Sequence, residues 1–491
     1  MNFAPAALEV IAYEGAPRTL EVAVKSSRSI DSVVNVGIVA DRAGLLEGVQ
    51  VERTAEALSY KAKLTLSTTM GVGEYRGALE IRLCYDEPLT CARPVEGAPW
   101  LLPYTIVVRK GTDLSPLRPL AGAKDWGMYQ GSAQHTGYVA ATVNPGAFGR
   151  RFRVELPETT ESSEIAVAQG LVALVSGVVP YIPWSVHGIH EATGAPAWTV
   201  ATADAWVQFN PPALADGMLY TVSSGSPSLW SFSAADGVLL NKTYLGSQRK
   251  IHLAPTVESG AIFAAGGNYG GMSRIAAGGA GVDWSKDLLW SSHWTPAVQG
   301  SLAYAYLADT LHAIHVADGA TAFTIVDPAL GGSGYTAPGA PAIADDGAVF
   351  VSRVAFRPDL PYTGLLRFDP IARSLSWSVA TQVLSQPVVA GETVYALEGG
   401  ALQARSARTG ASLWSWNAPS AFAGKGGQVD PLPLVVVGDL AFFCTIDGTM
   451  ALDLKTRQIV WTDPSIGRLA VSANGILYIR GTTELVAVNL H

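Results

Sequence analysis

Apolar and polar residues alternate with a period of two from residue 8 to about residue 109, as in strands that bury one face. The clearest runs are TLEVAVK (19–25), YKAKLTL (60–66), ALEIRLC (78–84) and YTIVV (104–108). With LEVIAY, VVNVGIVA and VQVER they make about seven strands, enough for two packed sheets. We therefore predict a β-sandwich over residues 1–110.

The pattern changes after a stretch rich in Pro, Gly and small residues, KGTDLSPLRPLAGAKD (110–125). This composition is typical of a linker, which we assign to residues 111–125. Beyond it a unit recurs in which Pro precedes a short apolar strand, an Asp/Gly turn and an aromatic-bearing strand. Examples are PPALADGMLYTV (211–222), TPAVQGSLAYAY (295–306), APAIADDGAVFVS (340–352) and SQPVVAGETVYAL (385–397). We expect the second domain to span residues 126–491.

The second half of the unit closes on an aromatic residue in most copies. The ends fall at Trp198, Asn241, Trp284, Phe323, Trp377, Trp414 and Trp461, between 37 and 54 residues apart. That period suits a four-stranded propeller blade. The final segment, RLAVSANGILYIRGTTELVAVNLH (468–491), supplies three strands and lacks the Trp-bearing fourth. An unpaired blade edge promotes aggregation, so we expect RFRVELP (151–157) to complete an eighth blade.

The repeat Ala-x-Asp-x-x-Thr-Gly-x-x-x-Trp resembles the tryptophan-docking repeat of the quinoprotein-like (PQQ-like) propellers, a WD40-like architecture. DWGMYQGSAQHTGY (125–138) is similar to the opening motif of that family. The resemblance implies an eight-bladed β-propeller in which each Trp packs against the next blade's turn, where Gly allows close approach. Arg457 replaces that Gly in one copy, so its turn is expected to differ. The docking residues implied are Trp198, Trp284, Trp377, Trp414 and Trp461.

The first segment resembles the last strands of bacterial Ig-like domains in GEYRGALEIRLCYDEPLTC and the following PWLLPYTIVV. The fold class expected for the whole chain is therefore all-β, an Ig-like β-sandwich followed by a propeller. Cys84 and Cys91 suit a disulfide that closes a hairpin, with two buried thiols as the alternative. The lone Cys444 in LAFFCTI is expected to be a small buried hydrophobe.

Composition excludes several classes of protein. Hydrophobic residues are 48% and charged residues 15%, which excludes a disordered chain. The 33 basic and 41 acidic residues show no basic cluster, so nucleic acid is a poor candidate partner. No run approaches the roughly 18 apolar residues of a membrane helix. MNFAPAALEVIAYEG has no signal-peptide pattern. The cysteine pair and the Ig-like resemblance nevertheless favour a periplasmic or extracellular protein over a cytoplasmic one.

Quinoprotein dehydrogenases of this fold hold their cofactor with calcium, a catalytic Asp and, in several members, a vicinal disulfide. Such a pair is impossible here because Cys444 is the one cysteine of the repetitive segment. No acidic and amide cluster matches the calcium site, and Walker, His-Glu-x-x-His and Gly-x-Ser-x-Gly motifs are missing. We therefore expect no catalytic residue, metal or cofactor, with a PQQ- and calcium-dependent dehydrogenase as the alternative.

The loops that join each Trp strand to the next unit all emerge on one face of the predicted ring. His252 and His293 each lie three residues before a Pro that opens a strand, and Asp430 has the same register. Local hydrogen bonding and rim packing are one reading of these loops; a ligand site with aromatic anchors is the other. We predict a non-catalytic scaffold or recognition protein that binds a protein, peptide or glycan of the cell envelope. Its site residues would be Trp206, His252, Trp290, His293, Trp294 and Asp430.

Overall fold

The computed structural model describes residues 1–15, 18–26, 35–54, 59–88, 90–157, 163–177, 184–202, 207–224, 226–246, 253–266, 270–288, 294–329, 339–353, 363–424 and 431–491. Two compact units are present, Met1–Asp113 with Trp461–Pro464, and Leu114–Val460 with Ser465–His491. Both consist of strands, and the second adds two short 3-10 helices, η1 (Pro145–Ala147) and η2 (Ala277–Gly279). Within the described residues, no helix has the length and apolar character needed to cross a membrane.

The first unit is a sandwich of two four-stranded sheets. One sheet has the order β1 (Asn2–Ala4), β3 (Arg18–Lys25), β6 (Ser59–Leu66), β5 (Leu46–Arg53). The other has the order β2 (Leu8–Tyr13), β8 (Trp100–Arg109), β7 (Gly73–Cys84), β4 (Asn35–Ala40). Every second residue of β3 and β8 is buried, and residues from both sheets share one hydrophobic cluster. The seven strands expected from alternation are present, and β1 is an addition.

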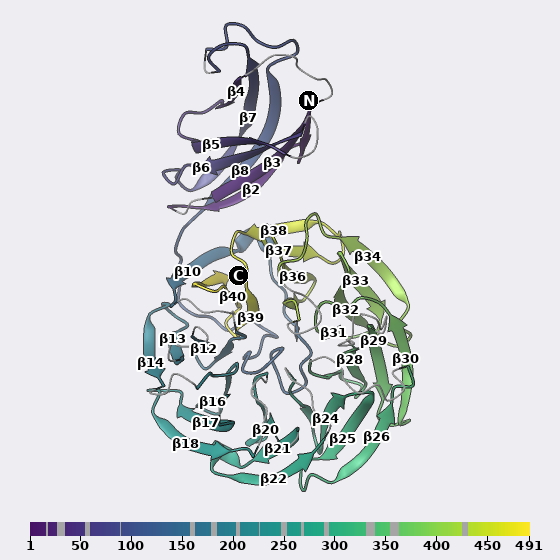
Figure 1. Cartoon of the computed structure of the whole chain (residues 1–491). Helices are drawn as coiled ribbons and strands as arrows, with labels where there is room; N and C mark the ends of the chain where they lie inside the picture. The colour runs from purple at the N-terminus through teal and green to yellow at the C-terminus, as the bar shows by residue number, and fades with distance from the viewer. Residues whose placement is uncertain are drawn as a thin grey trace. The chain divides into compact units, whose positions relative to one another are not determined.

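The second unit is built from sheets of antiparallel strands (Figure 1). In sequence order, the inner strand first, they are β11 (Ala166–Ala168), β12 (Leu171–Ser176), β13 (Ser185–His190), β14 (Pro196–Ala201); β15 (Ala213–Ala215), β16 (Met218–Val222), β17 (Ser228–Ser233), β18 (Leu239–Tyr244); β19 (Thr256–Glu258), β20 (Ala261–Ala265), β21 (Gly271–Ile275), β22 (Val282–Asp287); β23 (Ala297–Gln299), β24 (Leu302–Leu307), β25 (Thr310–His315), β26 (Thr321–Val326); β27 (Ala342–Ile343), β28 (Val349–Arg353), β29 (Gly364–Asp369), β30 (Ser374–Ala380); β31 (Val388–Ala390), β32 (Thr393–Glu398), β33 (Ala401–Ser406), β34 (Ser412–Asn417); β35 (Leu434–Val437), β36 (Leu440–Thr445), β37 (Gly448–Asp453), β38 (Ile459–Asp463).

The ring closes through a sheet that combines strands from both ends of the second unit. Its order is β39 (Arg468–Val471), β40 (Ile476–Arg480), β41 (Glu484–Asn489) and β10 (Gly149–Glu155), which overlaps the predicted closing strand 151–157. We call this the closing sheet. Each inner strand contacts the inner strand of the next sheet, and β39 contacts β11. The sheets therefore surround a common axis (Figure 1).

Residues 126–137, here called the axis segment, run through the middle of this ring (Figure 1). Their backbone carbonyls accept hydrogen bonds of 2.7–3.1 Å from inner strands of successive sheets. The donors are the N–H groups of Val167, Leu214, Val298, Ile343, Val389 and Val436, and Val257 donates to Met128 Sδ. The segment then pairs with β35 through β9 (Tyr138–Val139). The motif recognised from the sequence thus ties the inner strands of the propeller together.

Tryptophan docking links neighbouring sheets along their outer strands. Trp198, Trp284 and Trp377 donate from Nε1 to carbonyl oxygens of the next sheet, at 2.9 to 3.0 Å. A Cβ built on the facing glycines Gly237, Gly319 and Gly410 would lie 2.7 to 2.9 Å from the indole atoms. Each of these glycines has a φ of +73°, so glycine is required both for contact and for conformation.

Two copies carry arginine where the facing glycine is expected. Arg373 and Arg457 have φ values of +50° and +60°, so the turn keeps its left-handed residue. Their guanidinium carbons lie 5.2 Å from the Phe323 ring centroid and 5.4 Å from that of Trp414. The expectation that the Arg457 turn would differ is wrong, because the side chain stacks on the preceding aromatic ring instead of clashing with it.

Candidate functional site

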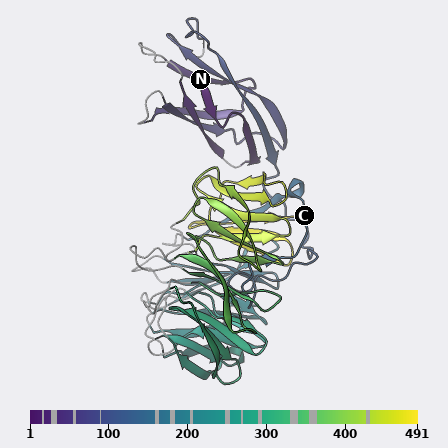
Figure 2. The same cartoon turned by 90° about the vertical axis from the view of Figure 1, so that its right-hand side faces the viewer.

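The candidate site lies on one of the two faces at which strand ends gather. In each meander the loop from the outer strand to the next inner strand, and the turn between second and third strands, emerge at the same end. Seen from the side of the ring, the strands run across its thickness (Figure 2). We call the end with these loops the mouth face. It is the face on which the sequence predicted binding.

The residues named from the sequence are mostly outside the described part of the chain. Trp206, His252, Trp290, His293 and Asp430 belong to residues that the structure does not describe. Trp294 is described and is 3% exposed. It packs in a hydrophobic cluster with Phe263 and Met272, and its backbone bridges to Gly339. Its position fits the packing alternative, so Trp294→Ala is now expected to reduce stability.

Four other polar residues of the mouth face were missed by the sequence argument, and three of them share a register. Glu164, Thr295 and Gln386 each precede their inner strands by two residues, and Arg468 begins β39. Thr295, Gln386 and Arg468 are all buried. Thr295 and Gln386 could have been found as the residues directly before the Pro that opens a repeat, in Thr295-Pro296 and Gln386-Pro387, whereas Glu164 and Arg468 have no such signal.

An ion pair joins two of these positions. Arg468 Nη1 lies 3.3 Å from Glu164 Oε1 and donates to the Pro431 carbonyl at 2.6 Å. Burial raises the pKa of Glu164, and the charge of Arg468 opposes that shift. Glu164 lies just before β11 of the first sheet, Arg468 lies in the closing sheet, and Pro431 lies just before β35. The ion pair therefore links three neighbouring sheets at the mouth.

A neutral polar group lies beside the axis segment. His135 Nε2 is 3.2 Å from Thr256 Oγ1, and its ring meets Tyr129 edge-on at 5.8 Å between centroids. Thr256 donates to the Pro296 carbonyl at 2.7 Å, while Thr295 donates to that of Ala254 at 2.8 Å. Burial lowers the pKa of His135 to about 3, so the ring is uncharged at neutral pH. This arrangement orders the axis and offers no charged general acid or base.

Further charged pairs tie adjacent sheets together near the same face. Asp327 Oδ2 accepts from Arg353 Nη1 at 2.5 Å and from the Tyr306 hydroxyl at 3.0 Å. Glu398 accepts from Arg405 of its own sheet and, at 2.8 Å, from the Thr381 hydroxyl of the preceding one. These carboxylates are buried and bonded to protein donors, which is how structural ion pairs are stabilised.

The described residues do not fit a PQQ–calcium centre. Calcium needs several oxygen ligands, commonly carboxylates and amides. At the mouth, the carboxylate of Glu164 is taken by Arg468 and that of Asp327 by Arg353. Cys444 is buried, with its sulfur 3.3 Å from Thr449 Oγ1 and the Gly467 carbonyl. We derive no redox step from this arrangement.

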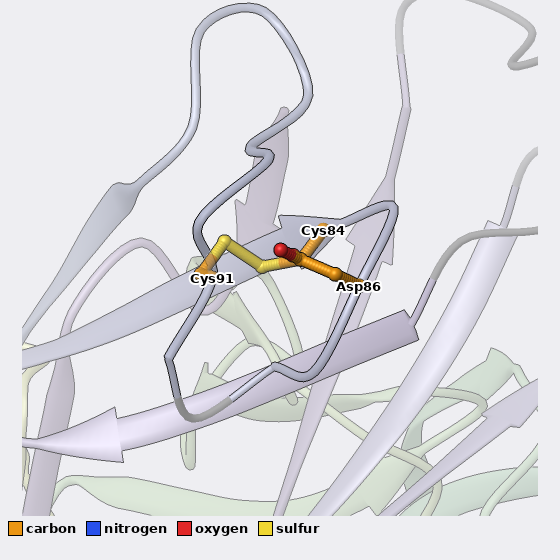
Figure 3. A group of neighbouring side chains, drawn as sticks. All are labelled: Cys84, Asp86 and Cys91. Carbon is orange, nitrogen blue, oxygen red and sulfur yellow. A yellow bond between two sulfur atoms is a disulfide. The ribbon is translucent and has the colours of Figure 1, made fainter.

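One group of possible metal ligands occurs in the first unit, Cys84, Asp86 and Cys91 (Figure 3). The two cysteines form a disulfide, with their Cα atoms 5.3 Å apart. Asp86 accepts from the Arg93 N–H at 3.2 Å and so holds the same hairpin turn. Disulfide sulfurs are not thiolates, which are the form that binds metals. The two cysteines of this group close the loop after β7 covalently.

Comparisons with known proteins give one family match and several similar solved structures. The family model described as "Outer membrane protein assembly factor BamB" matches residues 335–490. No curated protein sequence matches the chain. Similar solved structures include the WD40 β-propeller domain of Doa1 (11% identity, 70% of this chain and 97% of that chain, TM-score 0.39). Another is apo AztD from Citrobacter koseri (14% identity, 63% and 86%, TM-score 0.41).

The closed ring of sheets makes the second unit a β-propeller, and its residues 335–490 are those that match the family model. The matched residues run from the approach to β27 to the end of the closing sheet. The name of that family describes an assembly factor of outer-membrane proteins.

Proposed function

We propose that this chain is a non-catalytic, extracytoplasmic scaffold or recognition protein. It combines an Ig-like sandwich with an eight-bladed propeller, since the described residues of the second unit form eight sheets around one axis. The propeller binds a protein, peptide or glycan of the cell envelope through its mouth face. The disulfide between Cys84 and Cys91 supports export, because such bonds persist in oxidising compartments.

The observation that carries this proposal is the axis segment. Its carbonyls bond to inner strands of successive sheets, so the chain itself fills the middle of the ring. A ring stabilised in this way presents its loops from a rigid base, which reduces the ordering cost of binding. The name of the matched family, an outer membrane protein assembly factor, supports recognition of a protein partner.

Exposed apolar side chains also support binding through the mouth face. Ile446, in the turn between β36 and β37, is 63% exposed, and Ile466, before β39, is 39% exposed. Apolar side chains that are exposed to solvent and bordered by polar residues are typical of protein contact sites. Both belong to the last part of the propeller, within the residues matched by the family model.

The runner-up, a quinoprotein dehydrogenase, is separated from this proposal by a redox assay. The full chain is mixed with PQQ and calcium, and reduction of an artificial electron-acceptor dye is followed with a panel of alcohols and sugars. We expect no turnover above the protein-free control, because described carboxylates at the mouth already have protein partners. Stoichiometric quinone binding together with substrate-dependent dye reduction would reject the non-catalytic proposal.

A further inference from the structure

Arg480 is a fully buried arginine without an acceptor. It ends β40, and its side chain is 0% exposed. Neither Nε nor the two Nη atoms have a hydrogen-bond partner in the part of the chain that the structure describes. Burial lowers the pKa of Arg480 to about 10, so the group still carries its charge at neutral pH.

Other buried arginines of the propeller are bonded. Arg151 donates to the carbonyls of Glu191, Ser115 and Ala192 and to the Asn489 side chain. Arg353 is paired with Asp327, and Arg468 with Glu164. This fold therefore supplies acceptors to its buried guanidinium groups, most often carboxylates near the mouth face. Arg480 departs from that rule.

The residue lies where the closing sheet meets the first sheet, a boundary that we call the closing seam. It pairs with Arg468 on β39 and with Leu485 on β41. Across the seam, burial and the charge of Arg480 lower the pKa of His187 on β13 to about 4. Because β40 ends at Arg480, the guanidinium is near the mouth end of the seam.

The charged groups around this point do not balance. His187 is neutral at pH 7 and its ring nitrogens lie 2.7 Å from Ser176 Oγ and 3.2 Å from Thr199 Oγ1. Glu164 is held in its ion pair with Arg468, and Glu484, at the start of the next strand, is paired with Arg153. Arg480 is thus left as an uncompensated buried cation, which proteins normally avoid by pairing or by binding a ligand.

We propose that Arg480 anchors a binding site for a carboxylate at the mouth end of the closing seam. The guanidinium fork matches a carboxylate with two parallel N–H···O bonds, and Arg468 of the same sheet already pairs with a carboxylate, that of Glu164. Because Arg480 is fully buried, the proposal requires that the mouth end of the seam opens to admit the carboxylate. The inference does not depend on the recognition role proposed above.

The test is a titration of the full chain with sodium acetate at constant ionic strength, chloride being the reference anion. Thermal unfolding and isothermal calorimetry give the dissociation constant. We expect saturable stabilisation by acetate in the wild type and at least a tenfold weaker affinity in Arg480→Met, which keeps most of the volume and removes the charge. Without acetate, Arg480→Met is expected to be at least as stable as the wild type, because an unpaired buried charge is gone.

A matched control is Arg153→Met, on β10 of the same sheet, since that side chain is half exposed and paired with Glu484. It should keep the wild-type response to acetate. A second titration compares acetyl-Gly-Gly with its C-terminal amide. If the acid binds more tightly than acetate, a peptide terminus is the source of the carboxylate. If the acid and acetate bind equally, the source is a small free carboxylate. Three results would overturn the proposal: equal responses in all variants, saturation by phosphate but not acetate, or no anion response with Arg480→Met strongly destabilised.

Discussion

Replacing Trp377 by alanine is expected to lower the free energy of unfolding of the propeller by about 3–5 kcal/mol. The indole lies against Gly410, donates to the Ala407 carbonyl at 3.0 Å and contacts Phe350 at 5.9 Å between centroids. Truncation leaves a cavity between two sheets and an acceptor without its donor. The measurement is guanidinium unfolding followed by far-ultraviolet circular dichroism.

Two variants control for this effect. Trp377→Phe keeps a ring and removes the N–H group, so about 1 kcal/mol plus a smaller packing loss is expected. Leu413→Ala alters an exposed position of the neighbouring outer strand, β34, and should change stability by less than about 0.5 kcal/mol. If Trp377→Ala unfolds at the same denaturant concentration as Leu413→Ala, docking does not stabilise the ring.

Phe152→Ala is expected to cost about 3–5 kcal/mol as well, because it weakens closure of the ring. Phe152 is 4% exposed and packs on the Gly194 turn of the first sheet and on Tyr478 of the closing sheet. The strand that carries it, β10, pairs along its length with β41. Denaturant unfolding gives the energy, and faster hydrogen exchange of β10 and β41 amides locates the opening.

Arg153, next to Phe152 in the chain, provides the control for Phe152→Ala. Arg153 lies on the same strand, is half exposed and forms an ion pair with Glu484 at 2.6 Å. Exposed pairs contribute up to about 1 kcal/mol, so Arg153→Ala should be mild. Equal effects of the two substitutions, or unchanged exchange of β10 in Phe152→Ala, would contradict closure by this strand.

The repeat predicted the docking tryptophans and the closing strand because both follow from local rules. A recurring Asp-Gly or Thr-Gly in the turn before the last strand indicates a left-handed residue and a close contact, which Trp198, Trp284 and Trp377 make with the glycine of the next sheet. A last unit short of one strand requires a partner, which β10 supplies. Phe152 was missed as a docking residue because its strand, β10, lies outside the repeated units. The repeat pattern therefore did not relate it to the Gly194 turn.

Other features depend on contacts that no local pattern encodes. Arg373 and Arg457 keep a left-handed φ and lie over aromatic rings from the preceding sheet, so the rule that this position needs glycine failed. The axis segment was recognised as a motif, but its bonds reach inner strands hundreds of residues away. Pairing partners across such distances follow only from the closed ring.

The candidate site was predicted less well than the fold. The face was chosen from loop topology, but register alone did not reveal which side chains turn inward. Trp294, named as an anchor, is buried, whereas Thr295, Gln386 and the Glu164–Arg468 pair lie beside the mouth. Arg480 carried no signal in the sequence because its peculiarity is the absence of a described acceptor. Burial and pairing are three-dimensional properties.

The most direct test of the proposed recognition face is site-specific photo-crosslinking in the host's cell envelope. A photoreactive phenylalanine analogue replaces Ile446 or Ile466 on the mouth face, and Ile371, 89% exposed in the turn between β29 and β30, on the opposite face. The account predicts one shared, discrete crosslinked species from both mouth positions and none of it from position 371, with mass spectrometry identifying the partner. The same species from position 371, or adducts from position 371 alone, would contradict recognition through the mouth face.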